Sequence, residues 1–297
     1  MATMYLGRPG ALKAMLSPRR GVAAVIARQG KVRETLAGGR AADYSPTLLR
    51  SWDLTWRALS HDDQATLIAF YGGHNGFGPW AFIDGAERNL LTRNQSAATS
   101  VFNDTSGFTI AAGAGETLTS SAGTLERGPR ALQWTLPASV TSGVLSLDGP
   151  NSDWAGIPCV PGRTYRLQAR VRGGGTDGVA DVAAQLRWLS AAGTQVQLDA
   201  GTAVTTSTSG HTDVVMPATT CPAGGVYLQP RFAVSAGTVS GACTLWLEQF
   251  QVSMPTVLDA GTVWVPGLGV PRVSMPSMDH ELPWVNYHNT GLGLVEV

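Results

Sequence analysis

Residues 164–189, TYRLQARVRGGGTDGVADVAAQLRWL, decide the fold. Two short candidate strands, TYRLQARVR and VAAQLRWL, lie on either side of the Gly-rich stretch RGGGTDG at 172–178. A phosphate-binding loop would need a strand before this stretch and a helix after it, and no helix follows. We therefore interpret RGGGTDG as a hairpin loop.

Similar short segments recur from Asn89 to about Pro255, with almost no helical periodicity between them. Turns rich in Gly, Pro, Ser and Thr separate them, which is the pattern of a β-sandwich with Greek-key or jelly-roll connections. The candidate strands are FTIA, ALQWTL, GVLSL, TYRLQARVR, VAAQLRWL, HTDVVM, VYLQPRFAV and CTLWLEQFQV.

The N-terminal part has a different sequence pattern, with one predicted helix among its strands. In RSWDLTWRAL, residues 50–59, Trp52, Leu54 and Trp56 are two apart with polar residues between them, which predicts a half-buried strand. A helix is predicted next: Ser60 with Asp63 three residues later resembles a capping box, and the helix stops at Gly72-Gly73. Its apolar face is predicted from Leu67, Ile68 and Tyr71. GPWAFIDG then predicts a Gly-rich loop and a short strand.

The last segment, 256–297, contains the short candidate strands VWVP, PRVS, PWVNYH and GLGLVEV. These strands are too few to bury a sheet face alone, so they need another segment of the chain to pair with. Residues 1–88 are the expected partner, because a compact insertion leaves its two ends close together. The sequence thus predicts a mainly β protein: 1–88 with 256–297 as one β domain with one helix, and 89–255 as an inserted sandwich.

The bulk composition excludes several classes of protein. Charged residues make up only 14% of the 297-residue chain, and the formal net charge is zero. Such a balance argues against nucleic-acid or membrane-surface binding held by electrostatics. The N-terminus does not resemble a secretory signal, and no apolar run is long enough to span a bilayer.

The chain shows no signature of catalysis. Its five histidines, His61, His74, His211, His280 and His288, fall in no metal spacing, and HExxH, GxSxG and GKS/GKT motifs are absent. A pair of glycosidase carboxylates could still come from distant segments. We expect no enzymatic activity, no cofactor, no catalytic residue and no metal site.

The three cysteines, Cys159, Cys221 and Cys243, are too few and too scattered for a disulfide scaffold or a zinc site. We interpret them as buried free thiols. A Cys159–Cys221 bridge stays open as an alternative.

Aromatic residues are the remaining signal. A sugar ring can stack its apolar face on an exposed Trp or Tyr while its hydroxyls bond to polar side chains. Trp134, Trp188 and Trp246 lie inside candidate strands and are assigned to the core. The candidate glycan-binding residues are therefore Trp154, Tyr165 and Tyr227, with Trp154 in the loop GPNSDWAGIP the most exposed by expectation.

The middle segment also resembles a known class of domain. NLLTRNQSAAT at 89–99, LERGPRALQWTLP at 125–137, PGRTYRLQARVRGG followed by VAAQLRWLSAAGTQV, and CTLWLEQFQV together resemble the jelly rolls of carbohydrate-binding modules. Such modules occur as inserts in viral and bacterial surface proteins. The resemblance implies a fold and, more weakly, contact with a sugar.

The flanks resemble a narrower family. SWDLTWRALSHDDQATLIAFYGG, GFGPWAFIDGAERNLLTRNQS and GTVWVPGLGVPRVS resemble minor and distal tail proteins of long-tailed bacteriophages, especially those that infect actinobacteria. This resemblance implies a tail-tube-like fold at the tail tip of the virion and a homo-oligomer, most simply a hexameric ring. Its implied partners are the tail tube protein and tip or hub proteins, and phage DNA would meet it only by passing through the lumen.

Two functions follow as hypotheses. One is a structural tail protein that joins tube to tip by forming a ring, with the inserted sandwich facing outward toward host glycans. The alternative is a glycan-binding adhesin or receptor-binding protein of the virion. The sugar, the ring symmetry, the neighbouring tail proteins and the charge of the lumen stay open.

Overall fold

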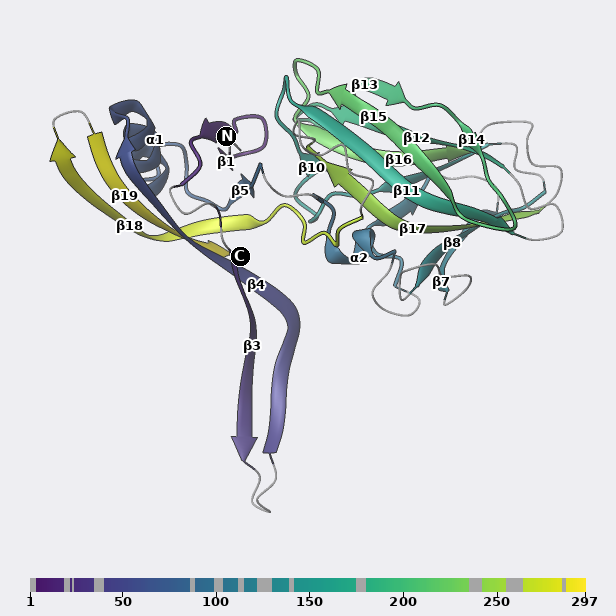
Figure 1. Cartoon of the computed structure of the whole chain (residues 1–297), viewed down its shortest axis with the longest axis horizontal. Helices are drawn as coiled ribbons and strands as arrows, with labels where there is room; N and C mark the ends of the chain where they lie inside the picture. Colours follow the sequence, from purple (N-terminus) through teal and green to yellow (C-terminus); the bar gives the residue numbers. More distant parts are fainter. Residues whose placement is uncertain are drawn as a thin grey trace. The chain divides into compact units, whose positions relative to one another are not determined.

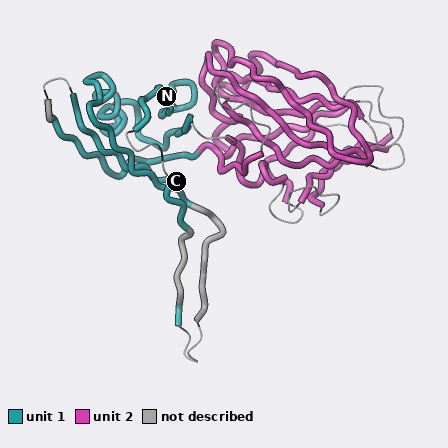
Figure 2. The backbone as a smooth tube through the Cα atoms, in the orientation of Figure 1, with its two compact units in different colours: residues 1–86, 271–297 teal, residues 87–270 magenta. Residues whose placement is uncertain are grey.

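The computed structural model describes residues 4–18, 22, 24–34, 40–85, 89–98, 104–111, 115–121, 130–138, 142–174, 180–234, 242–254, 264–284 and 287–297. The chain divides into two compact units, each described here by itself (Figure 2). Unit 1 comprises 1–86 and 271–297, and unit 2 comprises 87–270. The change back to unit 1 therefore lies after 270, later than the predicted 255.

Unit 1 is one antiparallel sheet, which we call sheet A, with a helix against it (Figure 1). Its elements are β1 (Met4–Gly7), β2 (Lys13–Met15), β3 (Ala24–Glu34), β4 (Arg40–Leu59), α1 (His61–Tyr71), β5 (Trp80–Ile83), β18 (Arg272–Trp284) and β19 (Tyr287–Glu296). The strand order is β2-β1-β5-β18-β19-β4-β3. The two C-terminal strands thus lie between N-terminal ones, so the two ends of the chain build one sheet.

The alternating pattern of β4 explains the core of unit 1. Trp52, Leu54 and Trp56 are buried, whereas Asp53 and Thr55 between them are exposed. The prediction of a half-buried strand is confirmed. Each large apolar side chain removed from water in this way contributes about 1.5–3 kcal/mol. The strand predicted at GPWAFIDG is also confirmed, as β5.

Helix α1 begins as the sequence predicts. The Ser60 hydroxyl accepts a hydrogen bond from the Asp63 backbone N–H, and the helix ends at Tyr71 before Gly72. The predicted apolar face is confirmed for Leu67 and wrong for the other two residues. Ile68 and Tyr71 are exposed, and the buried residues are Gln64, Leu67 and Phe70. Phe70 sets this rotation, because its ring packs edge-on against Trp80 with centroids 6.0 Å apart.

Unit 2 is a β-sandwich. Its elements are α2 (Arg93–Ser96), β6 (Phe108–Ile110), β7 (Thr117–Ser121), β8 (Ala131–Leu136), β9 (Gly143–Leu147), β10 (Ile157–Pro158), β11 (Thr164–Gly174), β12 (Asp181–Leu189), β13 (Gln195–Ala200), β14 (Val204–Thr205), β15 (Thr212–Thr220), β16 (Tyr227–Val234) and β17 (Cys243–Ser253). Sheet B has the order β13-β12-β16-β9-β6, with β10 beside β16 and β14 beside β12, and sheet C has the order β15-β11-β17-β8-β7.

Aromatic side chains join the two sheets. Tyr165 on β11 meets Trp188 on β12 with ring centroids 5.6 Å apart, and Phe250 on β17 meets Phe232 on β16 at 5.4 Å. Both contacts are close to edge-to-face, a favourable arrangement for aromatic pairs. The inward faces of sheets B and C therefore form one core, and the assignment of Trp188 to it is confirmed.

Two local predictions fail. Residues 172–174 of the predicted hairpin loop belong to β11, and β11 and β12 do not pair as a hairpin because they lie in sheets C and B; residues 175–178 lie outside the described residues. The described part of the predicted strand VWVP, 264–266, is not a strand. Its backbone instead bonds to the other junction of unit 2: the Val265 carbonyl accepts from the Asn89 amide at 2.8 Å, and Gly267 N–H donates to Ser96 Oγ at 2.9 Å.

Neither helix in the described ranges is long and apolar enough to cross a membrane.

Candidate functional site

The most unusual backbone in sheet C is a bulge in β17. Gln168 on β11 pairs with Gln251, but Arg170 pairs with Glu248, so the single residue Ala169 faces both Gln249 and Phe250. Gln249 has φ of 56°, a left-handed conformation that costs a residue with a Cβ about 1–2 kcal/mol. The extra residue places Glu248 and Gln251 on the same outer face of the sheet.

That outer face carries a ladder of polar side chains. The Arg170 guanidinium contacts the Asp213 carboxylate on β15 at 3.0 Å, and Glu248 lies directly across from Arg170 on β17. One step along, the Gln168 amide donates to Gln251 at 3.3 Å. Because each side chain is fixed by a neighbouring strand, the face holds its donors and acceptors in place without reorganisation.

A small cavity opens on this ladder beside the bulge. Its volume is about 40 Å³, room for one substituent of a ligand rather than a whole ring. The lining residues are Arg166, Gln168, Ala169, Arg170, Asp213, Val215, Gln249 and Trp264. Trp264 belongs to the irregular segment after β17, and its indole N–H donates to the Phe250 carbonyl at 3.3 Å.

Two polar groups on this face lack a hydrogen-bond partner within the described part of the chain. They are the side-chain amide nitrogen of Gln249, which lines the cavity, and the indole N–H of Trp246. Gln249 is only 7% exposed. A buried donor left unpaired costs about 1–3 kcal/mol, and such groups are rare enough to demand an explanation. An acceptor on a ligand would satisfy them.

A buried contact between a histidine and a glutamate supports the ladder from one side. His211 Nε2 lies 3.4 Å from Glu248 Oε1, with side chains 5% and 1% exposed. Glu248 is thus a group whose burial requires compensation by its neighbours. Trp246 lies two residues before Glu248 in β17, so both side chains are on the same face of the sheet. Trp246 is half-buried, so its predicted place in the core was wrong.

The three predicted glycan-binding residues are not on this face. Tyr165 is completely buried, and its hydroxyl accepts from the Val160 backbone N–H at 2.9 Å. Tyr227 is buried on β16, and burial raises the pKa of its hydroxyl. Neither ring offers a free face for stacking, because both residues are buried.

Trp154 is also mostly buried, against the expectation of exposure, at 9%. It does line an open cleft of about 520 Å³, together with polar residues of α2 and of the loop after β9. These polar groups already bond to one another: the Gln95 amide donates to the carbonyls of Gly107 and Asp148, both at 2.9 Å. The Gln95 amide in the Trp154 cleft therefore has its hydrogen-bond partners within the protein and needs none from a ligand.

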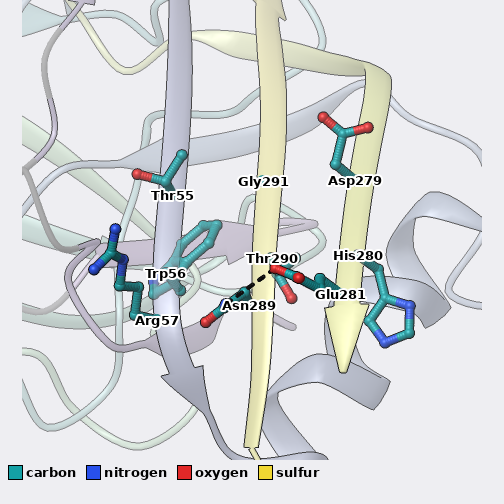
Figure 3. A pocket seen from close by; sticks show the side chains of 9 residues that line it. All are labelled: Thr55, Trp56, Arg57, Asp279, His280, Glu281, Asn289, Thr290 and Gly291. Carbon is teal, nitrogen blue, oxygen red and sulfur yellow. Dashed lines mark hydrogen bonds between the residues drawn. The ribbon is translucent and has the colours of Figure 1, made fainter. Parts of the chain in front are cut away.

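Unit 1 carries a third hollow, an open groove of about 510 Å³ on the side of sheet A away from the core (Figure 3). Gly291 on β19 leaves its floor bare between Thr55 and Arg57 on β4 and Asp279 on β18 (Figure 3). The Asn289 amide donates to Glu281 across it at 3.3 Å. Most of its charged side chains are exposed, whereas Trp56 and Thr290, which also line it, are buried.

The three cysteines are free and buried, which confirms their interpretation as thiols. Cys159 and Cys221, the pair for which a bridge stayed open, have Sγ atoms 3.5 Å apart. The hydrogen bond to Cys221 and burial both raise the pKa of the Cys159 thiol. Within the described ranges, no three His, Cys, Asp or Glu side chains are arranged to hold a metal ion.

The sequence contained a signal for the bulge site that the predictions did not use. In CTLWLEQFQV the apolar alternation runs through Leu245 and Leu247, and then resumes at Phe250 and Val252. The step from 247 to 250 is three residues rather than two, so one extra residue must be accommodated in the strand. The extra residue is accommodated at Gln249 in the structure.

Comparison with known proteins gives distant similarities only. No family model and no curated protein sequence matches the chain. Among solved structures, the enzymatically active domain of tailspike protein 4 of bacteriophage CBA120 matches with TM-score 0.42 and 18% identity, over 56% of this chain and 21% of that one. The CBM22-1 xylan-binding domain of Paenibacillus barcinonensis Xyn10C matches with TM-score 0.42 and 17% identity, over 57% and 97%.

A family 22 carbohydrate-binding module of Clostridium thermocellum Xyn10B matches with TM-score 0.40 and 15% identity, over 57% of this chain and 98% of that one. The chain spans only about a fifth of the tailspike domain that it matches. All three TM-scores lie below 0.5, so the function proposed next rests on the geometry of sheet C.

Proposed function

We propose that unit 2 binds a saccharide on the outer face of sheet C, and that the chain is a structural phage-tail protein whose sandwich contacts a glycan of the host surface. The observation that carries the binding site is the unpaired amide of Gln249, buried at a strained bulge beside a cavity. A folded chain keeps such a group at a cost, and a ligand hydroxyl or carbonyl would offset it.

The chemistry of the site fits a neutral sugar. Trp246 and Trp264 supply indole rings, which stack on the apolar face of a pyranose. Arg166, Gln168 and Asp213 supply donors and acceptors for hydroxyls. The charges of Arg170 and Asp213 compensate each other, so the face does not select strongly for an ionised ligand.

The proposed role is binding without catalysis. Hydrolysis of a glycosidic bond needs two carboxyl groups available to the scissile bond. The two carboxylates of this face, Asp213 and Glu248, are engaged by Arg170 and by His211. A hydrolase assay on bacterial cell-wall polymers is expected to show no turnover, and measurable turnover lost in D213N would overturn the non-catalytic role.

An array of bacterial surface glycans probed with the full chain tests the site. We expect binding to at least one saccharide, reduced at least tenfold by Arg166→Ala and by Trp264→Ala. The matched control is Gln197→Ala, an exposed amide on β13 of the opposite sheet, which should bind like the original chain. No binding to any glycan, or full binding by both site variants, would contradict the proposal.

A second candidate role, ring formation, is favoured by an observation in unit 1. β19 pairs with β4 only along Ser51–Leu59, so β4 residues 40–50 have only β3 beside them in the described sheet. Isolated two-stranded ribbons are marginally stable in water, and open edges invite pairing. A second copy of this chain is the partner we propose.

The apolar residues at the base of the ribbon agree with that partner. Val25 and Ile26 are neighbours on β3 and point to opposite faces, yet they are 66% and 47% exposed. The two edge strands of sheet A, β2 and β3, are different surfaces, which suits a head-to-tail contact that closes into a ring. Tail tube and tip proteins would then contact the two sides of the ring.

Mass photometry of the full chain tests ring formation. We expect a closed oligomer, most simply a hexamer, which V25K/I26K converts to monomer. V196K/L198K, which adds the same two charges at exposed apolar positions of β13, should leave the oligomer intact. A chain that stays monomeric at high concentration would remove the ring and leave the adhesin alternative, in which glycan attachment is the whole function.

A further inference from the structure

Three histidine rings form a chain of contacts at one end of unit 1. His61 is the first residue of α1, His280 lies on β18, and His288 lies near the start of β19. His61 Nδ1 is 3.4 Å from His288 Nε2, and His288 Nδ1 is 3.3 Å from His280 Nε2. Figure 3 shows the ring of His280 pointing away from the groove that Glu281 faces. His288 therefore lies between the other two rings and uses both of its nitrogens.

Counting protons shows what this chain can hold. Three imidazoles have six ring nitrogens, and each N–H···N contact leaves one of its two nitrogens without a proton. With both contacts intact the three rings can carry at most four protons, one more than in three neutral rings. A second positive charge must therefore place N–H against N–H in one contact. The three rings can therefore hold one positive charge with both contacts intact, whereas a second positive charge breaks one of the contacts.

The surroundings oppose a charge on the central ring. His288 is buried, with 5% of its surface exposed. Burial, followed by the charges of His280 and His61, lowers the pKa of His288.

The charged groups near the cluster do not compensate it by ion pairs. On α1, Asp62 and Asp63 follow His61, and Asp63 bonds to Ser60. On β18, Asp279 and Glu281 flank His280 but line the groove on the other face, with Arg57 of β4 beyond them. Within the described residues, no carboxylate forms an ion pair with any of the three rings.

We propose that His61, His280 and His288 are a pH-sensitive fastening that holds the end of the β18–β19 hairpin against the start of α1 at neutral pH and releases it in acid. The sign follows from the buried ring. A histidine whose pKa is lowered in the fastened state stabilises that state while neutral, and this stabilisation is lost as the pH falls below the pKa of an exposed histidine, about 6.5. The leucines beside the cluster, Leu59 and Leu292, keep the rest of the sheet packed.

Hydrogen exchange of the full chain, in EDTA and corrected for intrinsic rates, tests the fastening at pH 7.5 and pH 5.0. We expect protection of amides 287–290 and 61–66 to be lost at pH 5.0, while amides of β12 and β16 change little.

Two sets of variants separate the cluster from general acid effects. H61Q/H280Q removes the two exposed partner rings and leaves only the buried His288 to titrate, so the loss of protection in acid should become clearly smaller. H74Q removes an exposed histidine outside the cluster and should keep the full loss. Equal protection at both pH values in the original chain, or an unchanged acid response in H61Q/H280Q, would overturn the proposal. So would loss of protection on adding EDTA at pH 7.5, which would assign the contact to a bound metal.

Discussion

The proposed saccharide site depends most on one residue, Gln249. Its side chain contributes an unpaired donor to the sheet C cavity, and its backbone has φ of 56° at the bulge. Both features cost stability. Natural proteins retain such costs mainly at functional positions.

Replacing Gln249 by glycine separates binding from stability. Glycine adopts positive φ without strain, so the free energy of unfolding should not fall in Q249G, whereas saccharide affinity should drop at least tenfold. Denaturant unfolding and calorimetric titration measure the two quantities. Gln251→Gly in the same strand is the control: it removes the bonds to Gln168 and Val265 and should lower stability by about 1–2 kcal/mol. A stability loss as large in Q249G would show that the bulge is structural only.

Gly143 tests the packing of the core in the same way. A Cβ at this position would lie 2.7 Å from Trp134 Cζ2 and 3.0 Å from Leu136 Cδ2. Trp134 cannot move freely, because its indole N–H donates to Glu116 at 2.9 Å. Gly143→Ala should therefore destabilise unit 2 by about 1–3 kcal/mol in thermal unfolding. Gly210→Ala, where nothing lies within 4 Å, should change stability by less than about 0.5 kcal/mol.

The site residues were hard to predict for a physical reason. An aromatic residue is equally typical of a core and of a sugar-binding surface. The strand that contains Tyr165 was predicted correctly, but the residue type alone could not assign Tyr165 to the core. The bulge was readable in principle from the spacing of Leu247 and Phe250. The neighbours of Gln249 across the sheet, Arg170 and Asp213, come from β11 and β15, and pairing between distant strands leaves no local mark in the sequence.

At the scale of elements, strand existence was predicted better than strand partnership. All eight candidate strands of the middle segment occur as strands in unit 2. The missed strands, β7, β10, β13 and β14, are short or have mostly exposed residues. They therefore lack the apolar alternation on which such predictions depend. The Gly-rich stretch 172–178 fits a hairpin loop and an inter-sheet crossing equally well by composition, and only the pairing distinguishes them.

One contact joins the two sequence-distant parts of sheet A. Arg50 on β4 donates to both carboxylate oxygens of Glu296 on β19, at 2.9 and 2.8 Å, and its backbone N–H donates to the same group at 3.0 Å. Arg50 is 6% exposed. Removing one partner leaves a nearly buried charge without compensation, which is strongly destabilising.

Glu296→Ala should accordingly lower the free energy of unfolding of unit 1 by about 2–4 kcal/mol. Chemical denaturation followed by the fluorescence of the tryptophans in β4 measures it. Glu281→Ala, which loses one exposed bond to Asn289, should cost less than about 0.5 kcal/mol. Equal effects of the two changes would remove the Arg50–Glu296 contact as a determinant of the fold.

For the whole molecule, the division into units makes a prediction about folding. Unit 2 has its own core, and its two ends are tied together: the Asn89 side chain bonds to the carbonyls of Phe250 and Val265. Residues 87–270 expressed alone should therefore unfold in one cooperative transition. Residues 89–255, which lack the segment that contains Val265 and Gly267, should be clearly less stable. Equal stability of the two pieces would place the boundary at 255 after all.

The central claim is that the sandwich binds a saccharide on the outer face of sheet C. Its most direct test is the hydrogen-exchange difference map of the full chain with and without the saccharide that binds most tightly on the array. We expect added protection in 166–170, 211–215 and 246–251. Protection centred instead on the Trp154 cleft, at 148–155 and 93–96, or no change anywhere in unit 2, would contradict it.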